Sequence, residues 1–106
     1  MQRLTANQLY DQLRSTQEPP RLIDVREHWE YEIVHLEGTQ LFPLGQIHEL
    51  EEALDPGEEV VLICHHGIRS LQVAHYLEHQ GFTRVINLEG GIDAWARQVD
   101  PTLPTY

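Results

Sequence analysis

The chain has no lysine, a single cysteine and no long apolar run, and each scarcity excludes a class of protein. Its cations are seven arginines against seventeen acidic residues, and the formal net charge is −10 with the seven histidines neutral. Nucleic acids and anionic lipid surfaces are bound mainly through cationic side chains. We therefore expect no nucleic-acid partner and no membrane, and at most a basic protein partner beside small-molecule ligands.

The lone cysteine, Cys64, excludes an internal disulfide, a CxxC redox pair and a zinc site built from several thiolates. No segment approaches the roughly 18 apolar residues of a membrane span, and the polar start of the chain lacks the apolar core of a secretory signal. We expect a soluble, cytoplasmic protein. A length of 106 residues is usual for one domain, so residues 1–106 are expected to form a single domain. Because the sequence has no obvious exposed apolar stripe, we expect a monomer.

Apolar periodicity predicts alternating helices and strands. Thr5 and Gln8 have the spacing of a capping box, which predicts a helix that follows Thr5 and ends before Pro19. Short β-prone runs predict strands at 22–25, 39–42, 60–64 and 85–88. Helical spacing predicts further helices at 27–33, 44–54, 69–80 and 92–98. This alternation is typical of an α/β domain with a mostly parallel sheet flanked by helices on both faces.

The strongest predicted strand is the apolar run from Val60 to Cys64. Continuous apolarity of this kind is expected where helices cover both faces of a parallel sheet, which places the run at the centre of the sheet. Ligands of such sheets bind beyond the carboxyl ends of the strands. Cys64 ends this run and therefore lies where such sites are built. The alternative is a cysteine that only packs in the core.

The segment from Cys64 to Ser70 leaves the central strand and enters a helix. Backbone N–H groups at a helix N-terminus lack intrahelical partners, so several of them can converge on the sulfur and stabilise a thiolate. Gly67 fits a position that requires a positive φ or a close approach. Arg69 offers a fork of donors to loop carbonyls or to an acidic partner, and its charge favours the thiolate. Cys64 is therefore predicted to be a nucleophile.

His65 and His66 follow the cysteine directly and have two open interpretations: a solvated pair, or contacts to a substrate. A metal site is disfavoured because adjacent side chains diverge, the other histidines are scattered, and one thiol is a poor anchor. We expect neither a metal nor an organic cofactor.

The loop from Cys64 to Ser70 resembles the active-site loop of the rhodanese-like, single-domain sulfurtransferases. Further motifs follow in the order of that family, and the resemblance covers the chain from about residue 4 to Tyr106. They are Leu22 to Glu27, which resembles the family's DVRE strand end, then Glu30-Tyr31, His35, Gly38 and Pro43-Leu44, and Gly90 to Trp95, which resembles its GG-x-x-x-W ending.

The resemblance implies a five-stranded parallel sheet and a cysteine that takes a sulfane sulfur from thiosulfate or a persulfide. The cysteine holds this sulfur as a persulfide and passes it to a thiol, a sulfur-carrier protein or cyanide. Carried over, Cys64 is the nucleophile, and the persulfide loop consists of His65, His66, Gly67, Ile68, Arg69 and Ser70.

By the same resemblance, Asp24 and Arg26 support the loop, with a structural ion-pair network as the alternative. Arg69 is expected to share structural and anion-binding roles. Trp29 and Trp95 are expected to pack rather than to bind ligand.

The sequence leaves open how well thiosulfate serves as donor, and it leaves two rival functions. His65 stands where many relatives carry Arg or Lys, so thiosulfate is expected to be a mediocre donor. Cysteine phosphatases use a Cys-x5-Arg loop, whereas four residues separate Cys64 from Arg69 here, and Ser70 holds the position of the phosphatase arginine. A non-catalytic binding or regulatory module, or a carrier that works only with a protein partner, is the remaining alternative.

Overall fold

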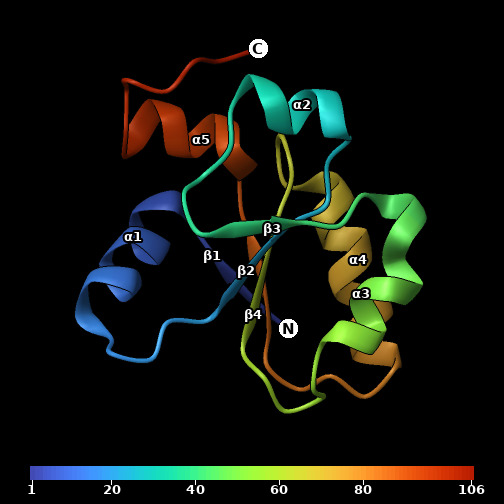
Figure 1. The fold of residues 1–106 in the computed structure, drawn as a ribbon. Helices are drawn as coiled ribbons and strands as arrows, with labels where there is room; N and C mark the ends of the chain where they lie inside the picture. The colour runs from blue at the N-terminus through green and yellow to red at the C-terminus, as the bar shows by residue number, and fades with distance from the viewer.

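The computed structural model describes residues 1–106 and contains a five-stranded, all-parallel sheet in the order β1-β5-β4-β2-β3 (Figure 1). The strands are β1 (Gln2–Leu4), β2 (Arg21–Asp24), β3 (Thr39–Leu41), β4 (Val60–Ile63) and β5 (Val85–Leu88). Every residue of β4 is buried, and the strand lies between β2 and β5. The prediction of a central strand at this position is confirmed.

Helices cover both faces of the sheet, as the sequence predicted. They are α1 (Ala6–Ser15), α2 (His28–Ile33), α3 (Ile47–Ala53), α4 (Ile68–His79) and α5 (Gly91–Gln98). A core that includes Leu50 and Leu77 joins α3 and α4 to one face. A second core that includes Leu9 and Trp95 joins α1 and α5 to the other. None of these helices combines the length and the apolar character needed to cross a bilayer.

The start of α1 confirms the predicted capping box. The Gln8 amide donates to the Thr5 hydroxyl at 3.2 Å, and the Thr5 amide donates to the Gln8 side chain at 2.9 Å. The predicted helix at 44–54 is divided instead, since residues Leu44–Gln46 form a 3-10 turn that precedes α3.

The edge strand β1 was not predicted from periodicity. It has three residues, of which only Leu4 is buried, so it is too short to display an alternating pattern. It forms by pairing in parallel with β5, with Gln2 opposite Ile86. A strand of this length depends on its neighbour for its hydrogen bonds, and that neighbour lies more than eighty residues further along the chain.

The two tryptophans differ from each other. Trp95 is 9% exposed and packs in the core, as expected. Trp29 is 60% exposed and Ile33 is 44% exposed, so the expectation that Trp29 packs is wrong. The reason is that α2 turns its polar side inward: its one buried residue is Glu30, whose carboxylate is bound by Arg69 and by the Tyr106 hydroxyl.

Candidate functional site

Cys64 directly follows β4, and its thiol is buried in the loop that leads to α4. The sulfur accepts a hydrogen bond from the Gly67 amide at 3.1 Å and another from the Ser70 hydroxyl at 3.3 Å. Gly67 has a φ of +94°, which confirms the predicted need for glycine there. Instead of several converging amides, the structure places one amide and one hydroxyl at the sulfur.

Asn87 on β5 supports this loop and was missed in the sequence. It is fully buried, its side-chain NH₂ donates to the Gly67 carbonyl at 3.1 Å, and its Oδ1 lies 2.5 Å from the Ser70 hydroxyl, which shares its single proton between this oxygen and the Cys64 sulfur. The only signal was a polar residue inside the apolar run 85–88. Asn87 therefore holds both groups that bond to the sulfur.

The N-terminus of α5 packs against the same loop from another side. The amides of Ile92 and Asp93 donate to the carbonyls of Cys64 and His65 at 2.9 and 3.0 Å. Gly91 has a φ of +60°, and a Cβ atom there would collide with both carbonyl groups. Gly91, the second glycine of the GG-x-x-x-W motif, thus permits the close approach of α5 to the Cys64 backbone.

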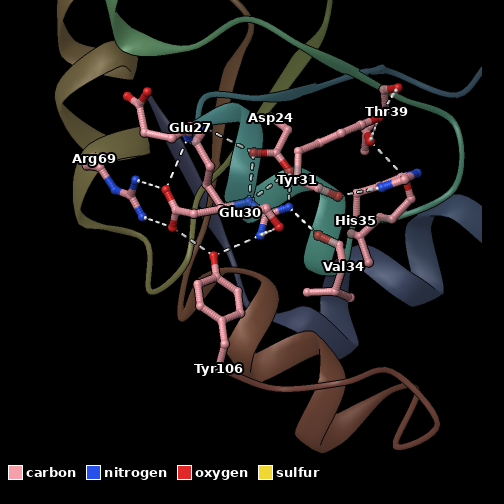
Figure 2. Close-up of polar contacts among 11 residues, drawn as sticks. Asp24, Glu27, Glu30, Tyr31, Val34, His35, Thr39, Arg69 and Tyr106 are labelled. Carbon is pink, nitrogen blue, oxygen red and sulfur yellow. Dashed lines mark hydrogen bonds and ion pairs between the residues drawn. The ribbon is translucent and has the colours of Figure 1, made fainter.

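Arg69 forms a bidentate ion pair with Glu30 of α2, as Figure 2 shows. The two guanidinium-to-carboxylate distances are 2.6 and 2.8 Å. The hydrogen bonds from Arg69 lower the pKa of Glu30 to about 2, and the same pairing raises the pKa of Arg69. From the sequence, Arg69 was expected to bind loop carbonyls or an acidic residue. The structure shows the acidic residue, Glu30, which binds both terminal nitrogens of Arg69.

Asp24 and Arg26 form a second, fully buried ion pair, with Arg26 Nη2 at 2.7 Å from Asp24 Oδ2. The same guanidinium donates to the carbonyls of Val34 and Glu30. No hydrogen bond joins Asp24 or Arg26 to the persulfide loop. Arg26 is linked to the loop only indirectly, through Glu30 and Tyr106. The structure thus shows the ion-pair network that was expected from the sequence as the alternative role of Asp24 and Arg26.

Tyr106 connects the two ion pairs (Figure 2). Its hydroxyl accepts from Arg26 Nη1 at 2.8 Å and donates to Glu30 Oε2 at 2.8 Å. Burial raises the pKa of Tyr106, so the phenol is protonated at neutral pH and able to donate. Its ring stacks on His65, with the centroids 3.8 Å apart and the planes at 5°. No local sequence pattern predicted the contact between Tyr106 and His65, because the two residues lie far apart in the chain.

Tyr31 and His35 belong to the resembling motifs; Tyr31 lies on α2, and His35 lies in the connection between α2 and β3. The Tyr31 hydroxyl donates to the Thr39 carbonyl at 3.0 Å, and His35 Nδ1 lies 2.8 Å from the Tyr31 carbonyl oxygen. Their rings also stack, with centroids 4.0 Å apart. These contacts secure the path of the chain after α2 and involve no loop residue.

The side chains of His65 and His66 do not diverge, which corrects the reason first given against a metal. Their rings lie 3.9 Å apart at 30°, and one ligand atom from each lies within 4.8 Å of the other and of Asp93. Imidazole binds metals in its ring plane, and stacked rings hold their lone pairs in separate planes. Asp93 is also bound to Arg97 at 3.0 Å. These three residues therefore fit a metal poorly.

His65 is uncharged in this setting, because burial lowers its pKa from the usual 6.5. Ile68, the other loop residue, is 70% exposed at the start of α4. The largest cavity of the molecule, about 300 Å³, is lined by residues of α1, α5 and their neighbours, and no loop residue borders it. The candidate site is thus the loop itself rather than a deep pocket.

The fold and the loop together define a class: a parallel α/β domain with a thiol in the connection after its central strand. The family model of the rhodanese-like domain matches residues 5–98, and the chain belongs to this family.

Three similar proteins illustrate the family. The chain is 44% identical over 90 residues to the rhodanese-like/PpiC domain-containing protein 12, chloroplastic, of Arabidopsis thaliana, which covers 81% of this chain and 30% of the plant protein. It is 41% identical over 80 residues to the putative sulfurtransferase YtwF of Bacillus subtilis, covering 76% and 77% of the two chains. The crystal structure of a rhodanese-like domain protein from Staphylococcus aureus has a TM-score of 0.84 at 28% identity, covering 100% of this chain and 99% of that one.

The chain thus spans less than a third of the plant relative's length. The family includes proteins named as sulfurtransferases, which supports sulfur transfer as the general activity.

Proposed function

We propose that this chain is a sulfurtransferase in which Cys64 carries a sulfane sulfur, as a persulfide, from a donor to a thiophilic acceptor. The observation that carries the proposal is the setting of the sulfur. It lies at the carboxyl end of β4 and accepts hydrogen bonds from the Gly67 amide and the Ser70 hydroxyl. Fixed donors aimed at an atom stabilise the negative charge that develops on it.

The proposed reaction has two displacement steps. The Cys64 thiolate attacks the outer sulfur of a donor, a new S–S bond forms, and the donor's own bond to that sulfur breaks. The electron pair of the broken bond leaves with sulfite, or with the thiolate of a donor persulfide. An acceptor thiolate then attacks the outer sulfur of the Cys64 persulfide, and Cys64 departs as a thiolate. Electrons balance without an oxidant, so the scheme needs no redox cofactor.

The charges around the loop favour a persulfide donor over thiosulfate. His65 is neutral, both terminal nitrogens of Arg69 are bound by Glu30, and the chain carries a net charge of −10. A dianionic donor therefore meets little free positive charge near Cys64. A sulfur-relay protein with a basic surface suits this field better, because its charge is complementary.

The same contacts disfavour a phosphatase. Ser70, at the position of the phosphatase arginine, is fully buried and bonded to Cys64 and Asn87. Arg69 is held by Glu30 on its terminal nitrogens. A tetrahedral phosphate would lack the free guanidinium that such loops wrap around it.

Mass spectrometry of the intact protein tests the proposal. After incubation with a small persulfide or thiosulfate, we expect the wild type to gain one sulfur atom and Cys64→Ser to gain none, since Cys64 is the only thiol. A cyanide or thiol acceptor should then remove the added sulfur. Equal addition to both proteins, or none to the wild type, would contradict the proposal.

A panel of donors and acceptors separates an independent enzyme from a partner-dependent carrier. It combines thiosulfate with cyanide, thiosulfate with a small thiol, and a persulfidated partner enzyme. Turnover that depends on Cys64 with small donors identifies an enzyme, and turnover only with the protein donor identifies a carrier.

A further inference from the structure

A thiol that receives and delivers sulfur must be reached, yet Cys64 is only 1% exposed. The groups that cover it therefore decide which acceptors approach. We infer that Tyr106 is the specificity-determining residue here: its ring closes the persulfide loop on the α2 side and excludes bulky acceptors from Cys64. The statement about acceptors rests on the proposed function, whereas the statement about access to the thiol does not.

The ring of Tyr106 covers the residue next to the nucleophile. It lies flat on His65 at 3.8 Å, and His65 Nε2 is buried without a hydrogen-bond partner beneath this aromatic contact. Trp29 meets the Tyr106 ring edge-on at 6.1 Å, and the His66 ring lies 3.9 Å from the His65 ring, tilted by 30°. The four rings form a continuous row, the aromatic wall, beside the loop.

Two charged groups hold the Tyr106 hydroxyl in place. Arg26 donates to it and Glu30 accepts from it, each at 2.8 Å. Hydrogen bonds to charged groups are stronger than neutral ones. Glu30 also binds Arg69, the loop residue that begins α4 together with Ile68. The anchor of the wall is thus part of the contact that secures the loop.

The other sides of the loop are built from fixed elements. Asn87 on β5 holds Gly67 and Ser70, and the amides at the start of α5 hold the carbonyls of Cys64 and His65. Tyr106 lies in the segment after α5, which has no regular secondary structure and which passes above α5 toward α2 in Figure 1. It is the side of the enclosure that no helix or strand builds, so replacement of the Tyr106 side chain should alter access most directly.

Alkylation of the single cysteine tests this assignment without any sulfur chemistry. The rates of a small reagent, iodoacetamide, and a bulky one, fluorescein maleimide, are compared for the wild type, Tyr106→Phe and Tyr106→Ala. In Tyr106→Ala we expect the rate with fluorescein maleimide, divided by the rate with iodoacetamide, to rise about tenfold. This corresponds to a change of about 1.4 kcal/mol in the relative activation free energy. Tyr106→Phe keeps the ring but loses the two hydrogen bonds of its hydroxyl, so we expect a smaller rise, within about threefold of the wild type.

Tyr76→Ala is the matched control, because Tyr76 is also half-buried, donates to a carboxylate, Glu51, and meets a histidine ring, His48. It lies on α4 and does not touch the loop's aromatic wall. An unchanged ratio in Tyr106→Ala, or an equal rise in Tyr76→Ala, would overturn the assignment.

Transfer kinetics then test the claim about acceptors. With persulfidated protein, Tyr106→Ala should lower the KM for glutathione relative to that for cyanide, whereas a merely destabilised protein would lose kcat for both. Equal KM changes would refute acceptor selection. If wild-type Cys64 takes up no sulfur at all, the proposed function fails, and the alkylation ratio still decides whether Tyr106 controls access.

Discussion

A single carboxylate, that of Glu30, joins the supporting contacts of the loop. It accepts hydrogen bonds from both terminal nitrogens of Arg69 and from the Tyr106 hydroxyl. Its Oε1 also accepts a hydrogen bond from the backbone amide of Glu27, the N-cap residue of α2. A buried charge is tolerated only where such partners satisfy it. At the residue scale, the loop therefore depends on the Glu30 side chain, although Glu30 forms no hydrogen bond with the Cys64 sulfur.

Replacement of this carboxylate should cost stability in a pH-dependent way. The folded pKa of Glu30, about 2, lies below its usual 4.5, so its contribution is complete above pH 4.5 and is lost as the pH falls toward 2. We expect Glu30→Gln to lower the free energy of unfolding by about 3 kcal/mol at neutral pH, with a gap to the wild type that narrows across this acid range. Urea unfolding at several pH values measures it.

The control for this variant is Glu32→Gln on the same helix. Glu32 is exposed and pairs only with the exposed His28, so its loss should change stability by less than about 0.5 kcal/mol. A pH-independent gap for Glu30→Gln, or an equal effect of the two variants, would count against the role given to Glu30.

At the scale of elements, the site is an intersection of β4, β5, α2, α4 and α5. Each brings one part: β4 ends at the thiol, β5 supplies Asn87, α2 supplies Glu30, α4 begins at the loop, and the first amides of α5 bind the loop carbonyls. The loop keeps its shape because these elements meet at the carboxyl edge of the sheet.

The approach of α5 gives a test at this scale. Gly91→Ala would place a Cβ against the backbone carbonyls of Cys64 and His65 at a φ of +60°. Backbone atoms cannot move aside as a side-chain end can, so we expect a loss of about 3 kcal/mol in unfolding free energy. The sulfur-transfer rate should fall more than about tenfold, since the loop is displaced.

Gly57→Ala is the control for Gly91→Ala, because a Cβ at Gly57 meets open space and its φ is not positive. Thermal unfolding and turnover of the two variants are compared. Gly91→Ala with wild-type stability and turnover would show that the close approach of α5 is dispensable.

At the scale of the whole molecule, charge dominates. The net charge of −10 surrounds a loop whose arginine is already paired, so anionic reagents should be repelled from Cys64. Alkylation by iodoacetate, an anion, should accelerate relative to neutral iodoacetamide by about threefold or more between about 0.01 and 0.2 M salt. The control is a small neutral thiol such as N-acetylcysteinamide. The salt-dependent increase in the iodoacetate-to-iodoacetamide rate ratio should be larger for the protein than for this thiol. A rate ratio that does not vary with salt, or a gain no larger than that of the small thiol, would mean that the net charge is not felt at the thiol.

Much of the fold and part of the site were predictable from local sequence. The capping box at Thr5, the central strand and the glycine with positive φ at Gly67 follow from short-range preferences, and the structure confirms them, with the strand ending at Ile63, one residue earlier than predicted. Periodicity failed for β1, which is too short to have a pattern. The general tendency of large aromatic side chains to be buried failed for Trp29, because α2 buries a carboxylate rather than an apolar stripe.

The sequence by itself determined the order of helices and strands other than β1, the family, and the position of the one thiol at the end of the central apolar run. These features depend on periodicity, turns and motifs, which are properties of neighbouring residues. Only the tertiary structure decided that Glu30 neutralises Arg69, that Asn87 holds the loop, and that Tyr106 lies on His65. Each of these contacts joins segments distant in the chain, and the direction of a side chain across such a gap is set by packing, which no local pattern records.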